Sequence, residues 1–284
     1  MPPNNSAPHD RPAAATVGVA AIQFAPGTDP VDNLAALRGH VETAARAGAR
    51  VVVAPEYSMF AVTRLDERVV AVAEPLTGPF ATGLAALAAD AGVYLVAGMI
   101  ESGPAGAARI RNTLLAFDPA GERIALYRKV HLYDAFGHRE SDVVEAGEIA
   151  APAVFTVDDV IFGMQTCFDL RFPEGFRRAA AGGAEVLLLP AQWIPGPGKV
   201  DQWTTLVRAR AIENTVYVVA ADQAAPRGAG ASMIVDPAGR VLAELGDETG
   251  VITAEMDPAR LEEVRASNPS LALRRFAIIE RAAE

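Results

Sequence analysis

Cys167 is the only cysteine in this 284-residue chain, and it follows the apolar run 160–162, which predicts a buried strand. Directly after it the sequence turns polar and reaches a proline, as Cys167-Phe168-Asp169-Leu170-Arg171-Phe172-Pro173. A thiol at the end of a buried strand is placed like a nucleophile at the rim of a sheet. The alternative is a small buried hydrophobe, which is the commoner role of a free cysteine considered alone.

A cysteine nucleophile needs a base and a group that stabilises the oxyanion. Glu56 ends the apolar run 51–54, and a partly desolvated carboxylate there is a useful base. Lys129 follows a second predicted strand, 123–127, where a cation can stabilise negative charge. The alternative for each is a strand-ending charge that faces solvent. None of the four histidines has an obvious partner that would make it the base: His9, His40, His131 and His138.

The elements that must position these side chains alternate along the chain. Apolar runs at 17–24, 50–54 and 94–99 predict buried strands, and helical spacing predicts helices at 32–48 and 80–91. Further strands and helices continue the pattern to residue 265, and the whole predicts layered α/β structure. Two Asp-Pro-Ala-Gly turns, 118–121 and 236–239, each predict a hairpin and suggest two similar halves within one domain.

The composition limits the possible partners and compartment. The net charge is −10, so the chain is a poor candidate for binding nucleic acid or an anionic membrane. No apolar run approaches the roughly 20 residues that span a bilayer. Residues 1–15 lack the order of a signal peptide and predict a disordered leader, which makes the cytoplasm the default compartment. Residues 16–267 would form the domain, and the apolar tail 268–284 would pack on the body or on a partner subunit.

Several motifs, in order, resemble the nitrilase, or carbon–nitrogen hydrolase, superfamily. They span roughly residues 17 to 260 and are Ala54-Pro55-Glu56, Tyr127-Arg128-Lys129-Val130-His131-Leu132-Tyr133-Asp134, Thr166-Cys167-Phe168-Asp169-Leu170-Arg171-Phe172-Pro173-Glu174, Arg208-Ala209-Arg210-Ala211-Ile212-Glu213-Asn214 and Gly230-Ala231-Ser232-Met233-Ile234-Val235-Asp236-Pro237. The resemblance implies a four-layer αββα sandwich with two mixed sheets flanked by helices. It also implies a homodimer or a higher homo-oligomer.

The same resemblance implies a Glu-Lys-Cys triad. Glu56 would be the general base for Cys167, and Lys129 would stabilise the tetrahedral intermediate beside the backbone N–H of Phe168. The family's second glutamate matches Glu140, which would orient Lys129 or position the substrate. Two nearby glutamates compete for this assignment: Glu145 and Glu148.

Arg171 resembles the form seen in omega-amidases and deaminated-glutathione amidases, which act on small amides that bear a carboxylate. Its planar guanidinium could pair with that carboxylate, or it could form a structural ion pair with Glu174 or another acid. Trp193 could line the pocket or could pack like any buried tryptophan, and Tyr133 is a further candidate for binding substrate. One departure from these amidases is Gln202, where they often carry a histidine.

The implied reaction is hydrolysis of a small amide to a carboxylic acid and ammonia through a thioester on Cys167, with no metal or cofactor. Two alternatives use the same residues: nitrile hydrolysis and N-carbamoyl amino acid hydrolysis. An alternative of another class is a non-catalytic protein that binds a small ligand on the same fold. A thiol redox protein would need a resolving cysteine, and the chain has none.

Overall fold

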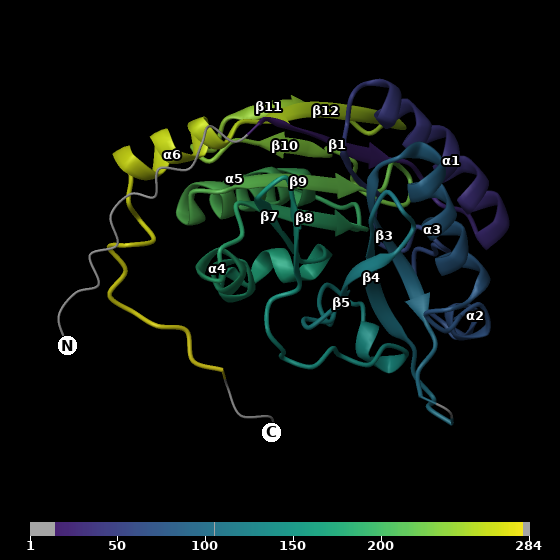
Figure 1. Ribbon diagram of the computed structural model, residues 1–284. Coiled ribbons are helices and arrows are strands. Elements are labelled where there is room, and N and C mark those ends of the chain that lie inside the picture. Colours follow the sequence, from purple (N-terminus) through teal and green to yellow (C-terminus); the bar gives the residue numbers. More distant parts are fainter. Residues whose placement is uncertain (1–14, 105, 281–284) are drawn as a thin grey trace.

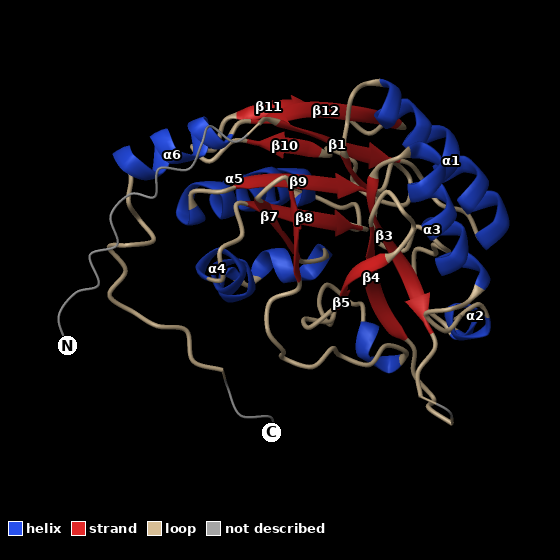
Figure 2. Ribbon diagram, in the orientation of Figure 1, coloured by secondary structure: helices blue, strands red, loops and turns tan. Residues whose placement is uncertain are grey.

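The computed structural model describes residues 15–104 and 106–280. Two sheets stack face to face, and helices cover the outer face of each (Figures 1 and 2). This arrangement confirms the predicted four-layer αββα sandwich. The predicted leader lies outside the described residues, apart from Ala15.

The first sheet has six strands, of which β1, β2 and β3 are parallel neighbours and the others pair antiparallel. In sheet order they are β12 (Gly250–Met256), β1 (Val17–Gln23), β2 (Val51–Val53), β3 (Tyr94–Glu101), β4 (Arg111–Phe117) and β5 (Arg123–Arg128). Its outer face packs against α1 (Pro30–Arg46) and α3 (Pro79–Ala91). The short helix α2 (Glu67–Ala71) has too few turns to show a helical period in the sequence.

The second sheet repeats this plan, with β7, β8 and β9 as parallel neighbours and the other strands antiparallel. Its order is β11 (Val241–Glu244), β10 (Met233–Val235), β9 (Tyr217–Asp222), β8 (Val186–Ala191), β7 (Val160–Met164) and β6 (Val154–Val157). Its outer face packs against α4 (Pro173–Ala181) and α5 (Lys199–Asn214). The last helix, α6 (Pro258–Ser267), follows β12.

The two Asp-Pro-Ala-Gly turns have the same construction, which supports the prediction of two similar halves. In each, one oxygen of the aspartate accepts hydrogen bonds from the backbone N–H groups two and four residues later. The closing glycines, Gly121 and Gly239, have φ of 80° and 82°, a conformation that glycine adopts without strain. Both turns join the last two strands of their half, β4 to β5 and β10 to β11.

The core lies in three apolar layers. In β1, Ala20 and Ile22 face the helices, whereas Val17, Val19 and Ala21 face the second sheet. Alternate residues of a strand point to opposite faces, so a strand buried on both faces must be apolar throughout. This explains why the central strands read as continuous apolar runs.

After α6, residues 268–280 extend away from the helix and run back toward α4 (Figure 1). Within the described ranges, no helix has the length and apolar character needed to cross a membrane.

Candidate active site

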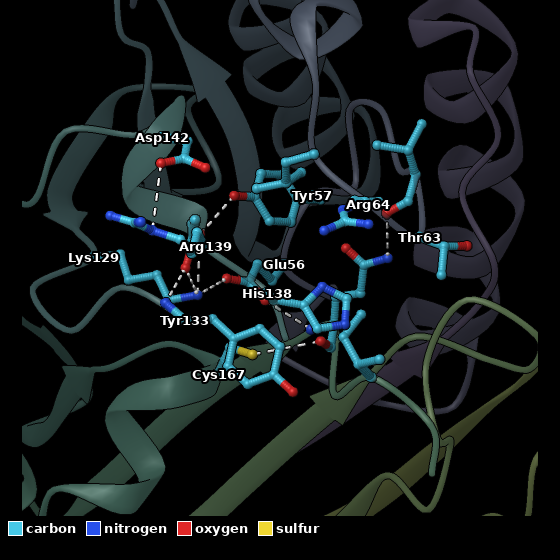
Figure 3. Close-up of a pocket in the computed structure, with 15 residues that line it drawn as sticks. Glu56, Tyr57, Thr63, Arg64, Lys129, Tyr133, His138, Arg139, Asp142 and Cys167 are labelled. Atoms are coloured by element: carbon cyan, nitrogen blue, oxygen red, sulfur yellow. Dashed lines mark hydrogen bonds and ion pairs between the residues drawn. The ribbon is translucent and has the colours of Figure 1, made fainter. Parts of the chain in front are cut away.

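Three strands end at one edge of the sandwich, and the residues that follow them meet there. Glu56 follows β2, Lys129 follows β5 and Cys167 follows β7. All three line one cavity of about 90 Å³ between the two sheets (Figure 3). The structure therefore brings together the residues whose types suggested a base, a cation and a nucleophile.

Lys129 lies between two carboxylates. Its Nζ is 2.8 Å from Glu56 Oε1 and 2.9 Å from Glu140 Oε2, and its side chain is only 2% exposed. Burial alone would lower the pKa of Lys129, but the charges of Glu140 and Glu56 raise it well above its ordinary value. Burial opposes ionisation of Glu140 as well, yet Lys129 holds the pKa of that carboxyl below its ordinary value. The cation therefore persists in a site that excludes water.

The two glutamates are held by further hydrogen bonds. Asn112 Nδ2 donates to Glu56 Oε1 at 2.6 Å and to Glu140 Oε1 at 3.1 Å. The backbone N–H of Gln192 donates to Glu56 Oε2 at 2.8 Å. Tyr57 Oη donates to Glu140 at 2.8 Å, and the N–H of Tyr133 does so at 2.6 Å. Neither Asn112 nor Tyr57 was predicted as a site residue, since neither stands in a motif that marks it in the sequence.

Geometry distinguishes Glu140 from its two competitors. Glu140 is buried in the cavity against Lys129. Glu145 instead pairs with Arg111 at 3.2 Å. Glu148 lines a different cavity, which the C-terminal tail also lines. Of the three glutamates, Glu140 is therefore the one that lies against Lys129.

Cys167 begins the 3₁₀ turn η2 (Cys167–Arg171) with a φ of 45°, which is uncommon for a residue that carries a Cβ. Strained backbone of this kind is often found at functional sites. Its Sγ lies 3.5 Å from the carbonyl oxygen of Gln192. Burial, and next the neighbouring Glu56 carboxylate, raise the pKa of the Cys167 thiol well above its ordinary value. The thiol therefore keeps its proton in the free protein.

Asp169 fixes the turn that carries Cys167. Its fully buried carboxylate accepts hydrogen bonds from the N–H of Thr166 and from Tyr127 Oη, at 3.1 and 2.7 Å. It also accepts from the N–H of His131 and contacts the Nδ1 of that ring at 2.7 Å. Tyr127 belongs to the first sheet, so Asp169 joins the nucleophile's turn to the opposite sheet. The sequence signal for Asp169 is a capping box, in which Thr166 precedes η2 and Asp169 follows three residues later.

Of the four residues proposed to bind substrate, Tyr133 lines the cavity, and Phe168, Arg171 and Trp193 lie outside its lining. The Tyr133 ring lies 5.1 Å from that of Phe168. Arg171 lies over the buried Trp193 ring at 4.8 Å. Its Nη2 donates to Gln202 Oε1 at 2.7 Å. No carboxylate lies within 4.0 Å of its guanidinium in the part of the chain that the structure describes, so the anticipated alternative of an ion pair with Glu174 is absent there.

Comparison with known proteins extends these observations. Residues 18–266 match the family described as carbon-nitrogen hydrolase. The chain is 38% identical to the hydrolase Rv0480c of Mycobacterium tuberculosis, over 90% of this chain and 94% of that protein. It is 35% identical to a deaminated glutathione amidase of Synechocystis sp., over 90% and 97% of the two chains.

Solved structures of the amidase from Nesterenkonia sp. AN1 share the fold. A Glu-to-Gln mutant of that amidase superposes with a TM-score of 0.79 at 28% identity, over 93% of this chain and 95% of that chain. In it the acetamide moiety of fluoroacetamide is covalently added at the active-site cysteine. A Cys-to-Ala mutant in complex with butyramide superposes with a TM-score of 0.76 at 30% identity, over 88% and 95%. The matched family and these relatives confirm the resemblance noted in the sequence: the chain belongs to the carbon–nitrogen hydrolase family of the nitrilase superfamily and is an amidase relative with an active-site cysteine.

Proposed function

We propose that this protein hydrolyses a small amide to a carboxylic acid and ammonia, with Cys167 as the nucleophile. The observation that carries the proposal is a buried thiol and a buried carboxylate, Glu56, in one cavity beside a cation that two carboxylates hold in its charged form. This arrangement supplies the nucleophile, the base and the electrostatic stabilisation that acyl transfer needs.

In the first half of the reaction, Cys167 Sγ attacks the amide carbon while Glu56 takes the thiol proton. The carbonyl π electrons move to oxygen, and the resulting oxyanion is stabilised by Lys129 and by the backbone N–H of Phe168. The protonated Glu56 then gives its proton to the amide nitrogen, the C–N bond breaks, and ammonia leaves. A thioester on Cys167 remains.

In the second half, Glu56 transfers a proton from water to Cys167. Glu56, again a carboxylate, takes a proton from a water molecule, and the hydroxide attacks the thioester carbon. The C–S bond breaks, the acid leaves, and the proton returns from Glu56 to Cys167. Glu140 takes no proton in this scheme. Its contact with Lys129 holds the ammonium toward the reacting carbonyl.

The cavity supports a small substrate. Its volume of about 90 Å³ suits an amide group with a short acyl segment. Two structures of the Nesterenkonia amidase hold short neutral amides, acrylamide and butyramide. By analogy with that relative, butyramide is a suitable first substrate to test.

The direct test measures ammonia release from short aliphatic amides, omega-amides, nitriles and N-carbamoyl amino acids by the wild type and by Cys167→Ala. Mass spectrometry of the slowed reaction is expected to detect an acyl adduct on the peptide that contains Cys167. Because the chain has no other cysteine, a thioester can form at no other residue.

The expected result is amide turnover by the wild type and none by Cys167→Ala, with the same circular dichroism spectrum for both. Turnover of any amide by the Cys167→Ala variant would overturn the assignment of the nucleophile. Turnover of only nitriles or only carbamoyl compounds would keep the triad and replace the substrate class.

A further inference from the structure

Asp222 is a buried acid that the proposed mechanism does not use. It ends β9, and 0% of its surface is exposed. Burial of a carboxyl group is unfavourable unless hydrogen bonds compensate for the lost water. The contacts of Asp222 should therefore show what it does in this protein.

The carboxyl group of Asp222 binds two backbone N–H groups through one oxygen. Its Oδ1 accepts from the N–H of Trp193 at 2.7 Å and from that of Gln223 at 2.8 Å. Its Oδ2 is buried and has no hydrogen-bond partner among the residues that the structure describes. Gln223 is the next residue in the chain, whereas Trp193 lies in the loop after β8. Asp222 therefore fastens that loop to the end of β9.

The N–H of Trp193 and the carbonyl of Gln192 belong to one peptide group. A trans peptide is planar and rigid, and its N–H and C=O bonds point in opposite directions. Asp222 Oδ1 lies on the N–H side, and on the other side the Gln192 oxygen lies 3.5 Å from Cys167 Sγ. Holding the N–H therefore aims the carbonyl at the nucleophile.

The same loop contacts the base. The N–H of Gln192 donates to Glu56 Oε2 at 2.8 Å. Gln223, whose N–H Asp222 also binds, donates from its side chain to the carbonyl oxygen of Glu56 at 2.8 Å. Both N–H groups that Asp222 binds therefore belong to segments that contact the active site.

We infer that Asp222 is a positioning residue for the proposed amide hydrolysis, on which this inference rests. By binding the Trp193 N–H, it keeps the Gln192 carbonyl oxygen directed at Cys167. The N–H of Gln192 then meets Glu56, so the nucleophile and the base keep their relative placement. Asp222 does not line the cavity and acts through this peptide.

The chemistry of the Asp222 side chain identifies the substitutions that test this role. Burial raises the pKa of Asp222 well above its ordinary value, although the backbone N–H groups of Trp193 and Gln223 oppose the shift. The group that holds the loop is thus an uncharged acceptor. Asparagine has the same shape and keeps this acceptor, whereas leucine has a similar shape and no acceptor.

The test compares butyramide hydrolysis and the pKa of the Cys167 thiol in the wild type, Asp222→Leu and Asp222→Asn. Alkylation by iodoacetamide at a series of pH values measures that pKa, and it reports on Cys167 alone because the chain has no other cysteine. Circular dichroism and urea denaturation establish that each variant is folded.

In Asp222→Leu we expect kcat to fall by about 10- to 100-fold and KM to change by less than about 3-fold, because the nucleophile and the base lose their alignment. We also expect the pKa of the Cys167 thiol to fall. The fixed carbonyl accepts from the protonated thiol and so favours it over the thiolate, and the substitution frees that carbonyl. Asp222→Asn should restore both properties.

Asp236→Leu is the matched control. Asp236 is also a buried acid of the second sheet, and its Oδ1 likewise accepts from two backbone N–H groups, those of Ala238 and Arg240. It does not line the cavity. Its substitution should lower stability and leave both kcat and the thiol pKa unchanged, because a general loss of stability does not redirect the Gln192 carbonyl.

An unchanged thiol pKa in Asp222→Leu, or the same changes in Asp236→Leu, would refute the positioning role. A thiol pKa that falls as far in Asp222→Asn as in Asp222→Leu would assign the effect to charge and refute it as well. If Asp222→Leu does not fold, Asp222→Ala takes its place.

The alkylation measurement needs no amide turnover, so it separates this inference from the proposed function. A lower thiol pKa in Asp222→Leu alone, with no amide hydrolysis by the wild type, would reject the proposed function and keep the positioning role. Hydrolysis by the wild type without that change in pKa would reject the positioning role alone.

Discussion

Cys167 depends on Glu56 because its own surroundings oppose the thiolate. Burial is the main reason, and the Glu56 carboxylate is the next, that the pKa of this thiol stands well above its ordinary value. Lys129 acts in the other direction but is already bound to Glu56 and Glu140. A thiol of this kind becomes a nucleophile only as its proton leaves. Glu56 must therefore take that proton while Sγ attacks.

Replacing Glu56 with glutamine should therefore change both the rate of amide hydrolysis and the pKa of the Cys167 thiol. Amide hydrolysis is expected to fall by about 10²- to 10⁴-fold, because the general base is lost. The thiol pKa is expected to move down from its wild-type value, because a negative neighbour is removed while Lys129 remains. Alkylation of Glu56→Gln by fluoroacetamide, followed at a series of pH values, measures that pKa.

Glu145→Gln is the matched control, because it neutralises an acid of the same type that lies outside the catalytic cavity. It should leave hydrolysis and the alkylation profile unchanged. If the thiol pKa obtained from the alkylation profile of Glu56→Gln were equal to or higher than that of the wild type, the electrostatic explanation would be contradicted.

At the scale of elements, the turn η2 and the end of β5 form one unit across the two sheets. Asp169 in η2 accepts hydrogen bonds from Tyr127 of β5 and from His131, which follows it. From the other side, the Arg210 side chain of α5 donates to the carbonyl oxygen of Leu170. The position of the nucleophile is thus set by groups from both halves of the molecule.

Asp169→Ala should lower both stability and turnover. The substitution leaves several buried donors without an acceptor, and we expect the free energy of unfolding to fall by about 3 kcal/mol or more. Urea denaturation followed by circular dichroism measures this change. We also expect kcat to fall more than KM rises, because Cys167 loses its fixed orientation.

Tyr127→Phe provides the comparison, since it removes only one of these hydrogen bonds and should cost about 1 kcal/mol. If Asp169→Ala were as stable as Tyr127→Phe, the turn would be held by other contacts.

At the scale of the whole molecule, the C-terminal tail exposes several large apolar side chains. Leu271 packs against the core, and Glu280 pairs with Arg178 of α4 at 2.8 Å. Between them, Leu273, Phe276 and Ile279 are 70%, 91% and 85% exposed. Exposed apolar clusters of this kind often mark an interface. We therefore keep the proposal that the tail packs on a second subunit of a homodimer or higher homo-oligomer.

Removal of the residues after Asn268 should then reduce the oligomeric state. Light scattering coupled to size exclusion is expected to show a larger assembly for the full chain than for the shortened one. Phe276→Asp tests the same contact at full length, and Val31→Asp, at an exposed position on α1, is its control. An identical mass for all of these proteins would refute the role of the tail.

Much of the fold follows from local patterns. The central strands are buried on both faces, so their sequences are apolar throughout, and the two Asp-Pro-Ala-Gly turns contain the residues their geometry requires. Glu56 and Cys167 each follow such a strand, and Lys129 follows the edge strand β5. The family motif matched its second glutamate to Glu140, but only the contact with Lys129 distinguishes this residue from the nearby Glu145 and Glu148.

By itself, the sequence determined the family, the layered fold and the residues that end its strands, because these depend on the order and spacing of neighbours along the chain. Only the tertiary structure decided that Asn112 bridges Glu56 and Glu140 and that Asp169 joins the two sheets. Such contacts join residues far apart in sequence. They exist only after the two sheets stack, when burial removes water and each buried charge requires a partner from another element.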